Sequence, residues 1–110
     1  MIVARVLFPV KVADKEEFVK KMAATTPKYE GMEGLTRKYY VMTEDNQHAG
    51  GIYLWENQAA ADAAYSEEWK AYMTEKYDHP PHIEFYEMPI TMDREYDCVY
   101  DEGDVADAAE

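Results

Sequence analysis

Two adjacent glycines, Gly50 and Gly51, interrupt a segment that otherwise has the pattern of a β-strand. The segment reads AGGIYLWE over residues 49–56, and an alanine-rich run over residues 59–64 follows at once. Glycine weakens a strand because it adds backbone entropy and has no side chain to pack. A strand that contains two glycines needs space beside its backbone, for a bulge, a crossing element or a ligand. We therefore expect a strand that leads directly into a helix and has free space along it.

The remaining sequence alternates between strand and helix patterns. Apolar and aromatic stretches predict strands over residues 2–8, 35–43, 48–56 and 82–88. Cap residues predict helical segments after Asp14, Asn57 and Ser66, and the first helix is expected to end near Thr25 because Pro27 follows. The order β-α-β-β-α-β is that of the ferredoxin-like α+β fold, in which a four-stranded antiparallel sheet has two helices on one face.

The charge of the chain is strongly negative and unevenly distributed. The 110 residues carry a net charge of −12, and residues 93–110 alone contain eight acidic groups and one arginine. We expect one folded domain over residues 1–92 and an acidic tail over residues 93–110. An acidic surface repels phosphate groups, so we expect neither nucleic acid nor an anionic membrane as a partner.

The sequence lacks the patterns of a membrane span, a signal peptide and a metal site. No apolar run approaches the roughly 20 residues that cross a bilayer. The N-terminus has no signal-peptide pattern, so we expect a cytoplasmic location. Cys98 is the only cysteine, and the three histidines have no zinc-binding spacing. We therefore expect no internal disulfide and no metal ion.

Both faces of the expected sheet carry apolar or aromatic side chains, although helices are expected on only one face. Side chains alternate along a strand, so Ile52 faces opposite to Tyr53. The second strand is expected to place Leu35, Tyr39 and Val41 on one face and Tyr40 and Met42 on the other. Soluble monomers rarely expose a large apolar face. Two sheets packed face to face would cover it, so we expect a symmetric homodimer.

Lys38, the Thr43-Glu44 pair and the AGGIYL string over residues 49–54 resemble the dimeric α/β-barrel superfamily of antibiotic-biosynthesis-type monooxygenases. Within it, the chain is most similar to the YdhR-like monooxygenases, and the order of elements agrees over residues 1–90. The resemblance implies a homodimer with a pocket in each subunit between sheet and helices. It also implies a monooxygenase that acts on an aromatic or polycyclic small molecule without a metal or flavin cofactor.

At two places this chain lacks residues that other branches of the superfamily use for catalysis, which argues against the activities of those branches. Haem-degrading relatives use an asparagine on the first strand, where this chain offers Arg5 and Phe8. Anthrone-type oxygenases use an asparagine four residues before a tryptophan on the third strand, where this chain has Gly51 before Trp55. Because one fold supports several functions, two alternatives stay open. They are a non-catalytic dimeric barrel that binds a small hydrophobic ligand, and an isomerase or cyclase on the same scaffold.

One histidine and three aromatic residues are candidates for the site. His82 is the candidate general base, because its reference pKa is close to neutral. Tyr40 and Tyr86 are candidates to donate hydrogen bonds to a phenol or quinone oxygen, and Trp55 to stack on an aromatic ligand. The alternative for Trp55 is that it packs under a helix or in the dimer interface. The alternative for the two tyrosines is that they are half-buried packing residues whose hydroxyls face water.

Lys38 and Gly51 are candidates for the substrate site on different grounds. A lysine within a strand either binds an anionic ligand group or pairs with Glu84 or Glu87 across the sheet, and the same choice holds for Arg5. Gly51 lies on the same face of its strand as Tyr53 and Trp55, so we expect its missing side chain to leave space for a ligand on that face.

Overall fold

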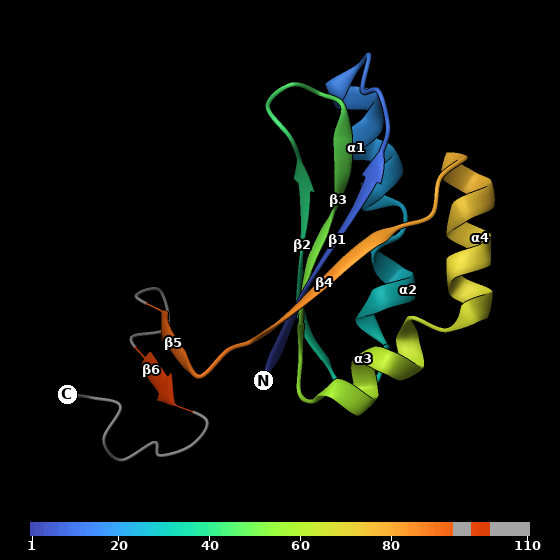
Figure 1. Ribbon diagram of the computed structural model, residues 1–110. Helices are drawn as coiled ribbons and strands as arrows, with labels where there is room; N and C mark the ends of the chain where they lie inside the picture. The colour runs from blue at the N-terminus through green and yellow to red at the C-terminus, as the bar shows by residue number, and fades with distance from the viewer. Residues whose placement is uncertain (94–97, 102–110) are drawn as a thin grey trace.

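A computed structural model describes residues 1–93 and 98–101 of the chain (Figure 1). The strands and helices of this described part are β1 (Ile2–Pro9), α1 (Lys15–Ala23), α2 (Thr26–Glu30), β2 (Leu35–Met42), β3 (His48–Trp55), α3 (Gln58–Ala64), α4 (Glu67–Tyr77), β4 (His82–Glu87), β5 (Ile90–Asp93) and β6 (Cys98–Asp101). Strands β1 to β4 form an antiparallel sheet, the main sheet, in the order β2-β3-β1-β4. Helices α1 to α4 lie on one side of it (Figure 1). This arrangement confirms the expected ferredoxin-like α+β fold.

Helices α1, α3 and α4 begin at cap residues that the sequence predicts. Three cap side chains accept a hydrogen bond from the backbone N–H three residues on, namely Asp14 of α1 (3.2 Å), Asn57 of α3 (2.8 Å) and Ser66 of α4 (3.1 Å). Helix α1 ends at Ala23, close to the expected end near Thr25, but a second short helix, α2, which was not expected, starts at Thr26. Pro27 lies in the first turn of α2, where a proline breaks no backbone hydrogen bond. Within the described residues, no helix is long and apolar enough to span a membrane.

The main sheet has a helix face, which packs against the helices, and an open face on the other side. The helix face carries Ala4, Val6, Phe8, Lys38, Tyr40, Tyr53, Trp55, Ile83 and Phe85. The open face carries Val3, Arg5, Leu7, Tyr39, Val41, Ile52, Leu54, His82, Glu84 and Tyr86. The core lies on the helix face, where Trp55 and Val6 are fully buried and pack with Trp69 and Met73 of α4.

A shift of register changes the faces of β2. The pairing of β2 with β3 is irregular between Leu35 and Arg37, as in a β-bulge. Leu35 therefore packs against the core, and the expectation that it shares a face with Tyr39 is wrong. Beyond the bulge, Lys38 lies directly opposite Tyr53. Lys38 and Tyr53 share the helix face because they are directly opposed in the hairpin register, and the bulge brings Leu35 to that same face.

The two glycines of β3 make room for different neighbours. A Cβ atom on Gly50 would collide with the carbonyl oxygen of Val6, so Gly50 allows the backbones of β1 and β3 to approach closely. A Cβ atom on Gly51 would instead lie 2.9 Å from Cε of Lys38 and 3.0 Å from Cε1 of Tyr53. Gly51 therefore makes room for side chains on the helix face.

Two short strands follow the four that the sequence predicts. β5 pairs with β6 in an antiparallel ladder in which Ile90 lies opposite Asp101. Figure 1 shows this pair beyond the end of β4, apart from the helices. Strands of four residues are too short to give a periodic signal, so sequence reasoning missed them. The expected boundary after residue 92 falls inside β5, and residues 94–97 and 102–110 of the expected tail lie outside the described residues.

Candidate functional site

A cavity of about 580 Å³ lies between the helices and the helix face of the main sheet. Its lining combines residues of β1, β2 and β3 with residues of α1, α2 and α4. The aromatic residues that line it are Phe8, Phe18, Tyr29, Tyr40, Tyr53, Tyr72 and Tyr77. The basic residues that line it are Lys11, Lys21, Lys28, Lys38 and Lys76. The volume is in the range of about 300–1,000 Å³ that small-molecule sites occupy.

The amino group of Lys38 is enclosed by three tyrosine rings. Its Nζ atom lies 3.4 Å from the ring centroid of Tyr29, 4.1 Å from that of Tyr40 and 4.6 Å from that of Tyr53. The ring faces attract an ammonium group. Within the described residues, however, no carboxylate lies within the 4.0 Å that defines an ion pair. The expected alternative for Lys38, a salt bridge across the sheet, is therefore not found among these residues.

The surroundings of Lys38 favour its neutral form. Burial lowers the pKa of Lys38 to about 7, and the positive charges of Lys28 on α2 and Lys76 on α4 act in the same direction. An ordinary lysine has a pKa of about 10.4 and is almost entirely protonated at neutral pH. Near neutral pH the neutral amine of Lys38 is therefore well populated, and a neutral amine can accept a proton from a ligand.

Tyr40 is held in place by a chain of hydrogen bonds. The Thr25 hydroxyl donates to the carbonyl oxygen of Met22 at 2.7 Å, and it lies 2.7 Å from the Tyr40 hydroxyl. The Thr25 hydroxyl donates its one proton to the Met22 carbonyl, so the Tyr40 hydroxyl is the donor in its bond to Thr25. The lone pairs of the Tyr40 oxygen remain available to accept a hydrogen bond from a ligand. Burial raises the pKa of Tyr40, so it stays a neutral phenol in the neutral pH range.

Trp55 lies in the core and does not contribute to the cavity lining. Its side chain is fully buried, and its indole N–H donates to the Tyr65 hydroxyl at 3.1 Å. The ring planes of Trp55 and Tyr65 meet edge to face, with 5.6 Å between their centroids. The structure thus places Trp55 under helices α3 and α4, as in the packing alternative.

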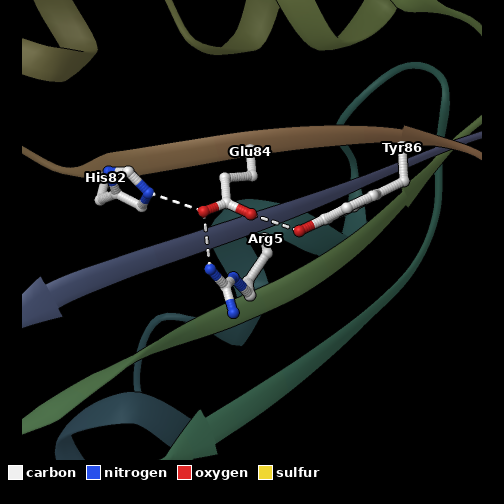
Figure 2. Close-up of polar contacts among 4 residues, drawn as sticks. All are labelled: Arg5, His82, Glu84 and Tyr86. Carbon is white, nitrogen blue, oxygen red and sulfur yellow. Dashed lines mark hydrogen bonds and ion pairs between the residues drawn. The ribbon is translucent and has the colours of Figure 1, made fainter.

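His82 and Tyr86 lie on the open face, across the sheet from the cavity. Figure 2 shows both side chains directed at Glu84, together with Arg5 of β1. Arg5 Nη2 and His82 Nε2 each lie 2.8 Å from Glu84 Oε1, and the Tyr86 hydroxyl donates to Glu84 Oε2. The hydrogen bonds from Tyr86 and His82, with the charge of Arg5, lower the pKa of Glu84 to about 2. Arg5 therefore forms the cross-strand pair that the sequence offered as one alternative.

Of the six candidates from the sequence, the structure brings Lys38, Tyr40 and Gly51 together. Lys38 and Tyr40 line the cavity, and Gly51 lies beneath Lys38. The reasoning from sequence did not single out Tyr29 or Tyr53, which complete the enclosure of Lys38. Within the described part of the chain, no group of three or more histidine, cysteine, aspartate or glutamate residues is placed to hold a metal ion.

Comparison with protein families identifies the group to which this chain is related. Residues 3–79 match the family described as "Putative mono-oxygenase ydhR". The chain belongs to the ydhR family. The resemblance drawn from Lys38 and the AGGIYL string is thereby confirmed, and the matched range contains every cavity-lining residue named above for this ydhR-family protein. Among curated protein sequences, none matches the chain.

Several solved structures share the fold of this ydhR-family protein. A monooxygenase from the gene ActVA-Orf6 of Streptomyces coelicolor, in complex with the ligand nanaomycin D, has a TM-score of 0.60 and 20% identity, with 79% of this chain and 86% of that chain covered. An antibiotic biosynthesis monooxygenase, described as putative, from Deinococcus radiodurans has a TM-score of 0.64 and 10% identity, covering 84% and 97%. The NE2512 protein of unknown function from Nitrosomonas europaea has a TM-score of 0.60 and 18% identity, covering 79% and 87%. At these identities the likeness shows the fold.

Proposed function

We propose that the protein is a cofactor-independent monooxygenase that oxidises an aromatic or polycyclic small molecule in the cavity. The observation that carries the proposal is Lys38, an amine without a carboxylate partner among the described residues and with a pKa of about 7, inside a cavity walled by aromatic rings. Membership of the ydhR family supports the reaction type. The structural relative from Streptomyces coelicolor, in complex with nanaomycin D, supports a small-molecule ligand on this fold.

Lys38 would act as the general base. Its neutral amine removes a proton from an acidic CH₂ group of the substrate, and the carbanion is delocalised over the aromatic rings. The carbanion gives one electron to O₂, and the substrate radical and superoxide combine into a peroxide anion. The peroxide takes the proton back from the Lys38 ammonium. Loss of water, in which the second C–H proton leaves and the O–O bond breaks, gives a ketone, so the substrate itself supplies the electrons.

The tyrosines would position the base and the substrate. Tyr29 and Tyr53 are buried rings that enclose the Lys38 amine, and they meet edge to face with 5.7 Å between centroids. The Tyr40 oxygen accepts a hydrogen bond from a substrate hydroxyl, because its own proton goes to Thr25. His82, the general base predicted from the sequence, lies on the other face of the sheet, so the proposed mechanism assigns its role to Lys38.

Oxygen consumption with anthrone as the substrate tests the proposed function. We expect one O₂ consumed per anthraquinone formed, at a rate well above the uncatalysed oxidation at pH 7. Treatment with a metal chelator is expected to leave the rate unchanged. Anthrone that binds without oxygen consumption would contradict the proposal and favour the non-catalytic ligand-binding barrel. Native mass spectrometry of the purified protein would identify any ligand that co-purifies.

We also propose that the protein is a homodimer assembled through the open face. Tyr39 and Tyr86 on this face are 48% and 47% exposed, and the same face carries the apolar residues Val41, Ile52 and Leu54. Packing two open faces together would remove this surface from water. Sedimentation at micromolar concentration is expected to give about twice the chain mass of 12.8 kDa. A stable monomer at that concentration would refute the assembly.

A further inference from the structure

The cavity lining is basic although the protein as a whole is acidic. The whole chain has 23 acidic and 11 basic residues, yet five lysines line the cavity and none of its described lining residues is aspartate or glutamate. Among the described residues, Lys21 is the one of the five with a carboxylate within 4.0 Å, that of Glu17 on the exposed side of α1. For Lys28, Lys38 and Lys76, no carboxylate of the described residues lies within 4.0 Å.

Lys28 and Lys38 approach the same ring, with their Nζ atoms 5.7 Å and 3.4 Å from the centroid of Tyr29, and Lys76 lines the same cavity. Lys28 Nζ lies 5.2 Å from the ring centroid of Tyr72 on α4, and Lys76 Nζ lies 5.6 Å from that of Tyr77. Both ammonium groups are close enough to Lys38 to disfavour its charged form. Like charges that face each other without a counter-ion destabilise the protein, and a bound anion relieves the repulsion.

The chemistry of the lining defines one class of ligand. The rings of Phe18 and Tyr72, which keep exposed surface at the cavity, suit a flat aromatic body, whereas the ammonium groups of Lys28 and Lys76 suit an oxyanion. We propose that the cavity selects aromatic molecules that carry an anionic group, such as a carboxylate or sulfonate, and that Lys28 and Lys76 bind this group. This inference deepens the proposed function, on which it rests, by naming the substrate class of the same site.

A matched pair of fluorescent probes tests the selection. 1-Anilinonaphthalene-8-sulfonate and N-phenyl-1-naphthylamine share one aromatic skeleton and differ in the sulfonate. We expect the wild-type protein to bind the sulfonate more tightly. The double variant Lys28→Gln/Lys76→Gln is expected to lose about tenfold or more in affinity for the sulfonate, with the affinity for the neutral probe changed less than about twofold.

The control is a double variant with the same change of charge on residues outside the cavity lining. Lys20 of α1 and Lys70 of α4 do not line the cavity, so Lys20→Gln/Lys70→Gln is expected to leave the affinities for both probes unchanged. Circular dichroism establishes that each variant is folded. A variant of the first pair that did not fold would be replaced by Lys28→Met and Lys76→Met measured singly.

Three results would overturn the inference. They are a failure of the wild-type protein to bind the sulfonate more tightly than the neutral probe, an equal loss of affinity for both probes, and an equal effect in the control variant. Because the readout is binding, it is independent of oxygen consumption. A protein that prefers the sulfonate but oxidises neither anthrone nor an anthrone that carries a carboxylate would refute the monooxygenase and leave the anionic ligand class in place.

Discussion

Replacing Lys38 by methionine is expected to lower the rate of oxygen consumption by about a hundredfold or more, since general bases contribute about 10²–10⁴-fold to rates. Methionine preserves the apolar stem of the side chain among the tyrosine rings but cannot accept a proton. The protein is therefore expected to fold and to bind an aromatic ligand, while turnover is lost. Initial rates with an oxygen electrode, together with ligand affinity, measure the two effects separately.

Lys38→Arg serves as the companion variant to this substitution. Arginine keeps the positive charge but stays protonated, so it cannot act as a base. We expect it to be as inactive as Lys38→Met. Lys20→Met, on α1 and outside the cavity lining, is expected to keep full activity. Full activity of Lys38→Arg would show that Lys38 supplies only charge, which would contradict its role as the base.

The same substitution is expected to change stability in a pH-dependent manner. The folded-state pKa of Lys38 is about 7, below its reference value of 10.5. Between these values the unfolded chain binds more protons, so wild-type stability rises with pH relative to Lys38→Met. Below pH 7 the variant is expected to be more stable by about 1–2 kcal/mol, less than the full pKa shift because the ammonium group is partly solvated. The difference is expected to vanish above about pH 10.5. Urea unfolding at pH 6 and pH 10 measures it.

Gly51→Leu is expected to block ligand binding while the homodimer persists. A side chain at this position would push against Cε of Lys38, 2.9 Å away, and Cε1 of Tyr53, 3.0 Å away. It would displace the amine from its tyrosine enclosure and fill part of the space above β3. The cost in stability is expected to be about 1–3 kcal/mol, as for overpacking in general. Fluorescent-probe affinity and sedimentation of the same variant measure the two outcomes.

Gly31→Leu is the matched control for this glycine. A Cβ atom on Gly31 would have no other atom within 4 Å, so the same substitution there is expected to change neither binding nor assembly. Loss of the dimer in Gly51→Leu would show that the space beside Gly51 belongs to the subunit interface. Unchanged binding in this variant would remove Gly51 from the site.

The sequence was sufficient to predict the fold because its local signals agree with one another. The caps at Asp14, Asn57 and Ser66 and the alternation along β3 all favour the same order of elements. Part of the site could also be predicted from the sequence. The hairpin pairs Thr43 with His48, and counting back from this pair places Lys38 opposite Tyr53 and Tyr40 opposite Gly51. These residues therefore share one face.

The remaining part of the site depends on information that no single segment contains. Tyr29 and Lys28 belong to α2, a helix of five residues whose proline reads as a helix stop. Lys76 reaches the cavity only through the packing of α4 on the sheet. The sequence suggested His82 as the general base because the reference pKa of histidine is close to neutral, but the strand register places it on the open face beside Glu84. Which face holds the cavity follows from the side on which the helices pack.

The most direct test of Lys38 as the base is its titration followed by NMR on protein labelled with ¹³C at lysine Cε. The signal of Lys38 is assigned by its absence from the spectrum of Lys38→Met. We predict that this signal titrates with a midpoint of about pH 7, far below the midpoints of about 10.4 expected for exposed lysines. The midpoint is predicted to rise in Lys28→Gln, because a repelling charge is removed. A Lys38 signal that titrates together with the exposed lysines would contradict the account.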